Sequence, residues 1–330
     1  MSTVKLAPGR LAGQYCRSLI AASGDPFGAS GFSAGRGYPD IVSRAAVASH
    51  NLDDADLLSV RADFMAALAL VSAVDRLAAG RTVPFDTRGV MSSGGASASF
   101  VGDGQPIPLS TDPLVIGSTL ARHAKVAGLS VITAELARSA APESMILDGL
   151  VNAIAVATDA AFLDVSNEGP SASPTMGSAP ASPLFGLSPA ASIPAVLEAV
   201  AAGGSVLSAA AWVMSPATAA KLAVTTVSNI PAYPGMNARG GTLYGLPVIT
   251  SVGSPAGQVA LFDAQYLRVA SDAPAIDTSR SATLQMATDP VPGAAQVTSL
   301  FNTNAIALRA VRQITWAMVG TGHAAWTTVS

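Results

Sequence analysis

The sequence predicts an α+β fold divided into two or three compact units. A chain of 330 residues is long enough to bury more than one core. Residues 142–164 repeat apolar side chains with the 3.6-residue period of a helix, whereas residues 82–129 have the pattern of extended chain punctuated by glycine. Residues 187–280 then alternate between helical and strand patterns, which predicts a mixed α/β unit.

The first 40 residues predict an extended arm that becomes ordered against a partner. They are rich in Gly, Ser and Pro, and their sequence has no sustained period. Residues 1–50 carry five basic and two acidic side chains, a balance of +5 − 2 = +3, which leaves −6 for the rest of a chain of net charge −3. A mildly basic arm suits the acidic surface of a neighbour or nucleic acid, and a solvated arm is an equal alternative.

A helix and a hairpin are predicted next. Residues 53–79 place apolar side chains at helical spacing, and the aspartates at their start suit the positive end of a helix dipole. Residues 82–108 and 113–129 predict the two arms of a long hairpin.

The clearest local signal is the helix at residues 142–164, whose first turn contains Pro142 and Glu143. Asp148 and Asp159 are close to three turns apart on it, so they share one face at a separation of about 16 Å. That separation is too large for a catalytic carboxylate pair. We interpret the face as solvated or as an interface.

Residues 169–186 contain four prolines among small residues and predict a linker between units. Beyond it we expect helices at residues 193–202 and 216–226, and strands at residues 209–214, 247–251, 258–262, 305–311 and 315–319.

The composition indicates a chain that hides much of its surface against partners. It is 50% hydrophobic and only 12% charged, against roughly 25% charged residues in an average soluble domain, and its mean hydropathy is +0.44. No membrane span is expected, because the longest apolar stretch, residues 65–74, is shorter than the roughly 20 residues that cross a bilayer. The N-terminus lacks the pattern of a secretory signal, so we expect the product to stay in the cytoplasm where it is made.

One motif suggests catalysis, and its flanks argue against it. Residues 31–35 match the G-x-S-x-G pattern of hydrolases, which requires a strand before Ser33 and a helix after it. Both flanks are rich in Gly and Pro, so we attribute the match to composition. A cytoplasmic α/β hydrolase that uses Ser33 is the alternative from a different functional class.

No other pattern predicts a catalytic, cofactor-binding or metal-binding residue. The three histidines lie far apart without metal-ligand spacing: His50, His123 and His323. The lysines are followed by Leu or Val, where a phosphate-binding loop requires Ser or Thr. Cys16 is the only cysteine, and we interpret it as a small buried or arm residue.

Several strings occur in a fixed order along the chain. They are FVGDGQPIPLS at residues 100–110, an approach segment at residues 130–139, the helix at residues 142–164, AWVMSPAT at residues 211–218, LYGLPV at residues 243–248 and FNTNAIALR at residues 301–309. This series resembles the Hong Kong 97-type major capsid proteins of tailed phages, in order and spacing, over residues 53–320. Asp103 replaces the glutamate that is more usual in the family.

The resemblance implies a subunit with an N-terminal arm and helix, an E-loop, a P-domain and an A-domain. In order, these correspond to residues 1–84, residues 85–128, residues 129–168 with 281–313, and residues 187–280 with 314–330. In the family, the E-loop reaches across the neighbouring subunit, and the long helix is the spine of the P-domain. The A-domain surrounds a five-fold or six-fold axis.

The resemblance also implies residues for assembly, with no catalytic residue, metal or cofactor. They are Phe100, Gly102, Asp103, Gly104, Pro106 and Pro108 in the E-loop turn, Leu147, Ile154 and Phe162 in the core of the spine helix, and Arg10, Arg17 and Arg36 in the basic N-arm.

The implied function is self-assembly of hexamers and pentamers into an icosahedral phage head that encloses double-stranded DNA. The implied partners are further copies of the chain, the packaged DNA, a portal, and scaffold, protease or cement proteins, with no membrane. The shell is expected to assemble in the cytoplasm of the bacterial host and to become the virion capsid. An encapsulin-type compartment is the alternative within the same fold.

Overall fold

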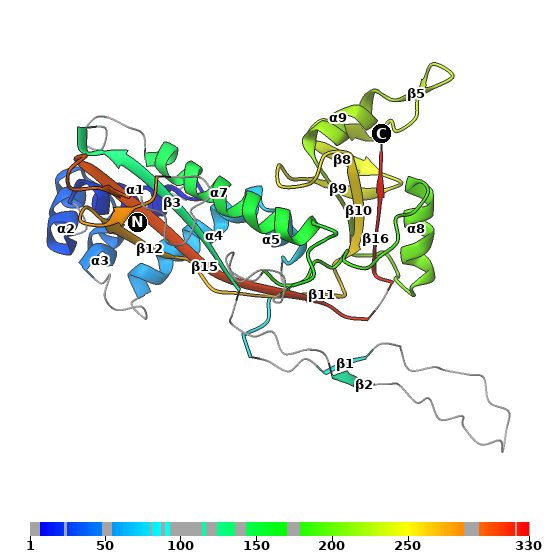
Figure 1. Cartoon of the computed structure of the whole chain (residues 1–330), viewed down its shortest axis with the longest axis horizontal. Helices are drawn as coiled ribbons and strands as arrows, with labels where there is room; N and C mark the ends of the chain where they lie inside the picture. Colours follow the sequence, from blue (N-terminus) through cyan, green and yellow to red (C-terminus); the bar gives the residue numbers. More distant parts are fainter. Residues whose placement is uncertain are drawn as a thin grey trace, which may run out of the picture.

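The chain is elongated, with one long sheet and one six-stranded sheet at different ends (Figure 1). The structure is a computed structural model that describes residues 7–22, 25–47, 55–79, 81–86, 90–92, 114–116, 124–135, 143–169, 179–286, 297–320 and 322–329.

The N-terminal segment forms three helices, so the predicted extended arm is wrong. They are α1 (Arg10–Ala21), α2 (Pro26–Gly35) and α3 (Asp40–Val47). The start of α2 had a local signal, because Asp25 accepts the backbone N–H of Gly28 at 2.7 Å and Pro26 occupies the first turn. The many Gly and Ser residues between the apolar positions obscured this pattern.

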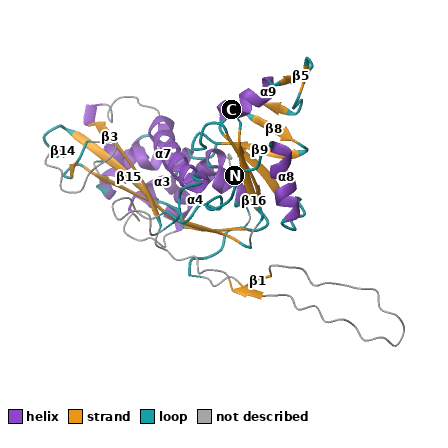
Figure 2. Cartoon of the chain, turned by 45° about the vertical axis from the view of Figure 1, so that its right-hand side comes forward, coloured by secondary structure: helices purple, strands orange, loops and turns teal. Residues whose placement is uncertain are grey.

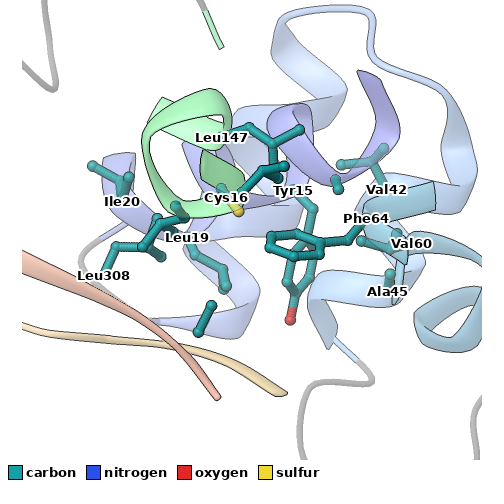
Figure 3. Packing of buried hydrophobic residues seen from close by; sticks show 14 of the residues in the cluster. Tyr15, Cys16, Leu19, Ile20, Val42, Ala45, Val60, Phe64, Leu147 and Leu308 are labelled. Atoms are coloured by element: carbon teal, nitrogen blue, oxygen red, sulfur yellow. The ribbon is translucent and has the colours of Figure 1, made fainter. Parts of the chain in front are cut away.

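Helix α1 is ordered by burial against other helices of the same chain. It buries Tyr15, Cys16 and Leu19 at helical spacing, in one core with the spine helix and α4. Figure 3 shows these side chains facing Phe64 and Leu147 across the cluster. The N-terminal helices therefore need no second subunit to be packed.

The helix predicted at residues 53–79 is present but divided in two. α4 (Ala55–Val71) is followed by α5 (Ala73–Leu77), and Ser72 between them has an extended backbone. The Ser72 hydroxyl accepts the N–H of Asp75 at 3.3 Å and so caps α5.

The long sheet is built around one strand, β15 (Ala305–Met318). β3 (Lys125–Thr133) pairs with the first part of β15 on one side. β12 (Ala275–Ser279) and β11 (Leu267–Ser271) pair with successive parts of its other side, and all these pairings are antiparallel. The spine helix α7 (Glu143–Leu163), which matches its prediction closely, packs against β3 (Figure 2).

The six-stranded sheet has the order β16, β10, β4, β9, β8, β7. In chain order these strands are β4 (Ala210–Met214), β7 (Met236–Asn237), β8 (Gly240–Leu243), β9 (Leu246–Thr250), β10 (Gln258–Asp263) and β16 (Ala324–Thr328). The pair β4 and β9 is parallel and the other neighbours are antiparallel.

Two helices accompany this sheet, close to their predicted bounds. They are α8 (Ile193–Ala202) and α9 (Pro216–Val224). Ser192 and Ser215 cap their N-termini by accepting backbone N–H groups, and each helix has a proline in its first turn. Such caps lie next to the helix in the sequence, which explains why these elements were predicted well.

Short strand pairs complete the described chain. They are β1 (Val90–Ser92) with β2 (Leu114–Ile116), β5 (Thr226–Val227) with β6 (Ile230–Pro231), and β13 (Thr283–Leu284) with β14 (Thr298–Ser299). The antiparallel pairing of β1 with β2 agrees with the predicted hairpin in the residues that the structure describes.

The long sheet crosses the unit boundaries that the sequence suggested. Strand β12 precedes residue 280, within the range assigned to the A-domain, yet it pairs with residues 307–311 of β15, which were assigned to the P-domain. Strand β11 pairs with residues 314–318 of the same strand. The strand β15 also continues to Met318, past the predicted boundary at residue 313, as one strand where two were expected.

Candidate functional site

The residues considered for catalysis have ordinary structural surroundings. Ser33 lies within α2, and its hydroxyl donates to the carbonyl oxygen of Ser30 at 2.8 Å, so it is not on a strand-to-helix turn. Burial raises the pKa of the Cys16 thiol to about 12, which keeps it protonated near neutral pH. Among the described residues, no group of three or more His, Cys, Asp or Glu side chains could hold a metal ion.

The predicted core residues of the spine helix are buried, but they belong to two different clusters. Leu147 and Ile154 pack with the N-terminal helices and the long sheet. Phe162 packs instead with Phe262 of the six-stranded sheet and with Trp316, at ring-centroid distances of 5.0 and 5.3 Å. Phe162 therefore belongs to a different core from Leu147 and Ile154, and the spine helix links both cores.

Asp148 and Asp159 do not share a solvated face, contrary to the sequence interpretation. Asp148 is exposed, whereas Asp159 is fully buried and accepts four hydrogen bonds. Burial raises the pKa of Asp159, and the hydrogen bonds to Ser251, Ala73, Val74 and Ser72 act in the opposite direction. The carboxyl group is therefore a structural centre in the interior.

A buried ion pair joins α5 to the long sheet. The Arg312 side chain on β15 has no exposed surface and donates to both carboxylate oxygens of Asp75, with a third hydrogen bond to the Ser271 hydroxyl at 2.9 Å. This two-bond pairing fixes the orientation as well as the distance between α5 and the long sheet.

The Asp63 carboxylate caps the start of α1, although the two are far apart in the sequence. Asp63 on α4 accepts the backbone N–H groups of Gly9 and Ala12 at 2.9 and 3.1 Å, where α1 begins. Gly9 has no side chain that could cap α1, so α4 supplies the acceptor. Asp63 and Asp159 had no local signal in the sequence, because each caps a segment more than 50 residues away.

The three arginines of the predicted N-arm differ in their surroundings. Arg10 and Arg36 are exposed, and the Arg36 guanidinium lies 5.2 Å from the ring centre of Phe32. Arg17 is buried within α1, which contradicts its assignment to a free arm. The residues predicted for the E-loop turn, Phe100, Gly102, Asp103, Gly104, Pro106 and Pro108, lie outside the described residues.

The outer end of the second unit carries exposed apolar side chains. The β5–β6 hairpin projects from it (Figure 1), and Val224, Val227 and Ile230 are 77%, 65% and 68% exposed. Ser228 and Asn229 have φ values of 51° and 62°, the left-handed conformation of a tight hairpin turn. We call Val224, Val227 and Ile230 the apolar tip. Exposed apolar groups gathered on a projecting hairpin and at the end of α9 favour contact with another protein surface.

None of the helices in the described part of the chain is both long and apolar enough to cross a membrane.

Comparisons with known proteins agree with these features. The phage capsid family matches residues 59–316. The chain is 32% identical over 315 residues to the capsid polyprotein of Pseudomonas phage PAJU2, covering 84% of this chain and 46% of that protein, so it spans about half the length of this relative. Solved structures from Mycobacterium phage Adephagia and Gordonia phage Cozz both have TM-scores of 0.51, at 16% and 17% identity. They cover 79% of this chain, and 91% and 87% of theirs. The chain belongs to the phage capsid family and has the Hong Kong 97-type fold.

Proposed function

We propose that the chain is the major subunit of a tailed-phage head, in which hexamers and pentamers form an icosahedral shell around double-stranded DNA. The match of the phage capsid family to residues 59–316 carries this proposal, because it includes the spine helix and most strands of both sheets. Low charge and an exposed apolar tip support it, since a subunit enclosed by neighbours has little free surface.

The parts of the subunit have proposed positions in the shell. The E-loop, assigned to residues 85–128 from the resemblance, is proposed to end before Lys125, where β3 joins the long sheet, and to reach the neighbouring subunit. The spine helix and the long sheet form the P-domain, with β11 and β12 included because they pair with β15. The six-stranded sheet forms the A-domain, whose apolar tip faces the axis of the hexamer or pentamer.

The proposed role is structural, without a catalytic residue or cofactor. The proposed partners are copies of the same chain, the packaged DNA, a portal, and scaffold, protease or cement proteins. Assembly is proposed to take place in the cytoplasm of a bacterial host.

Electron microscopy of the purified chain and of particles from a producing host tests this function. We expect closed shells from the chain, and DNA-filled heads with one tail vertex from the host. Small tail-less shells that hold an enzyme would instead identify an encapsulin-type compartment. A stable monomer with esterase activity, abolished by Ser33→Ala, would contradict the proposal.

The apolar tip provides a sharper test of the proposed subunit contacts. Replacing Val227 and Ile230 together by Asp should leave the unfolding free energy within about 0.5 kcal/mol, because both side chains are exposed. Closed shells should be lost, since charges would be buried between copies. The measurements are urea unfolding and particle yield after gradient centrifugation.

The matched control exchanges the same two residues, Val227→Ile with Ile230→Val, and keeps the apolar surface. It should assemble like the unmodified chain. Normal shells from the double Asp variant would place the apolar tip outside the subunit contacts.

A further inference from the structure

We propose that Asp159 is a positioning residue that fixes how the six-stranded sheet is seated on the spine helix, and thereby sets the shape of the subunit that the shell requires. This inference rests on the proposed shell function. It concerns a buried carboxylate that joins three separate segments of the chain.

Both oxygens of Asp159 are used, and each accepts one hydroxyl and one backbone group. Oδ1 accepts the Ser72 hydroxyl at 2.9 Å and the N–H of Val74 at 3.2 Å. Oδ2 accepts the N–H of Ala73 at 2.7 Å and the Ser251 hydroxyl at 2.6 Å. The spine helix, the start of α5 and the turn that follows β9 therefore meet at one side chain.

The turn after β9 lies directly on the backbone of the spine helix. A Cβ atom added to Gly253 would stand 2.6 Å from the carbonyl oxygen of Val156 and 3.0 Å from the backbone nitrogen of Ala160. The Ser251 hydroxyl also accepts the N–H of Gly253 at 3.1 Å, which holds the turn in this close approach. The turn cannot slide along the helix without losing the Asp159 bond.

The segment on the other side of Asp159 is itself immobilised. α5 is capped by Asp159 at its N-terminus and is joined to β15 by the Asp75–Arg312 pair. Asp159 therefore connects the six-stranded sheet to an element that is already fixed to the long sheet. Through this chain of contacts, the orientation of one sheet depends on the other.

A carboxylate suits this position better than an amide. Each oxygen of Asp159 faces a backbone N–H, from Ala73 or from Val74. Asparagine has one acceptor oxygen, so in either orientation its NH₂ group would face one of these donors. The two serine hydroxyls can rotate, but the backbone donors cannot.

The test compares three variants of the full chain. Asp159→Asn disrupts the whole centre, and Ser251→Ala removes the bond from the turn after β9 to Asp159 together with the bond from the Gly253 N–H to the Ser251 hydroxyl, so exchange at Gly253 itself is left out of the comparison. Asp148→Asn is the control, because Asp148 is exposed on the same helix. The readouts are backbone hydrogen exchange at residues 251–254 and the diameter distribution of assembled particles in electron micrographs.

We expect exchange at residues 251–254 to become about tenfold faster in Ser251→Ala, as for the loss of a hydrogen bond to a charged group. Uniform closed shells should fall to a minority of its particles, replaced by open or irregular forms. Asp148→Asn should match the unmodified chain in both readouts. Asp159→Asn should show the larger defect, and if it fails to fold, Ser251→Ala alone decides.

Uniform shells from Ser251→Ala despite faster exchange would overturn the positioning role, and so would unchanged exchange. Either result leaves the proposed function intact. If the unmodified chain forms no particles under the same conditions, the proposed function fails, and the exchange result still reports whether Asp159 holds the turn.

Discussion

Replacing Asp75 with Asn should destabilise the subunit by about 3–5 kcal/mol, because the buried Arg312 guanidinium would lose its counter-charge. An asparagine has one acceptor oxygen and no charge, so it cannot reproduce the two-bond pairing. Urea unfolding of the purified chain measures the loss. Little soluble protein at growth temperature should accompany it.

An exposed ion pair on the same sheet provides the control. Asp277 accepts from Arg309 at 2.8 Å, and both side chains are more than half exposed. Asp277→Asn should change the unfolding free energy by no more than about 1 kcal/mol. Equal effects of the two substitutions would show that Arg312 does not depend on Asp75.

The second large effect is expected at the centre of the spine helix. Ile154→Asp should destabilise the subunit by several kcal/mol, since it places a carboxylate in an apolar core. Ile154 has no exposed surface and packs next to Gly128 of β3, where an added Cβ atom would stand 3.4 Å from its Cγ1, so the carboxylate would be placed out of contact with solvent. Soluble yield and particle assembly should both be lost.

A substitution at the neighbouring residue, Ala153, separates the effect of burying a carboxylate from the effect of adding a charge to the helix. Ala153, the residue before Ile154 on the spine helix, is exposed, so Ala153→Asp should keep a soluble, folded subunit. Ile154→Val should cost only about 0.5–1.5 kcal/mol by urea unfolding. Wild-type assembly of Ile154→Asp would contradict the buried face assigned to the helix.

Elements with local signals were predicted well. The spine helix and α8 have sustained apolar periods, and α8 and α9 begin at serine caps followed by proline. Strands β4, β9 and β10 were found within one residue of their bounds, because short apolar runs there are bounded by turn residues. The resemblance to capsid proteins, carried by the order of short strings, was confirmed by the family match.

The N-terminal helices show where composition misled the prediction. Their Gly and Ser content is typical of a flexible segment, yet α1 is ordered because Tyr15, Cys16 and Leu19 are buried against α4 and α7. A helix that draws its stability from tertiary packing need not have a strong propensity of its own. The E-loop turn residues remain predictions from the resemblance.

The sequence alone determined the fold class, the spine helix, the elements of the second unit and the family. The tertiary structure decided that Asp159 is a buried centre, that Arg17 is buried, that β11 and β12 join the long sheet, and that Phe162 belongs to the second core. The reason is the distance along the chain between partners. A helix period or a serine cap depends on residues that are close together in the sequence. In contrast, Asp159 and Ser251 are 92 residues apart, and Asp75 and Arg312 are 237 residues apart. Only the folded chain brings such groups together.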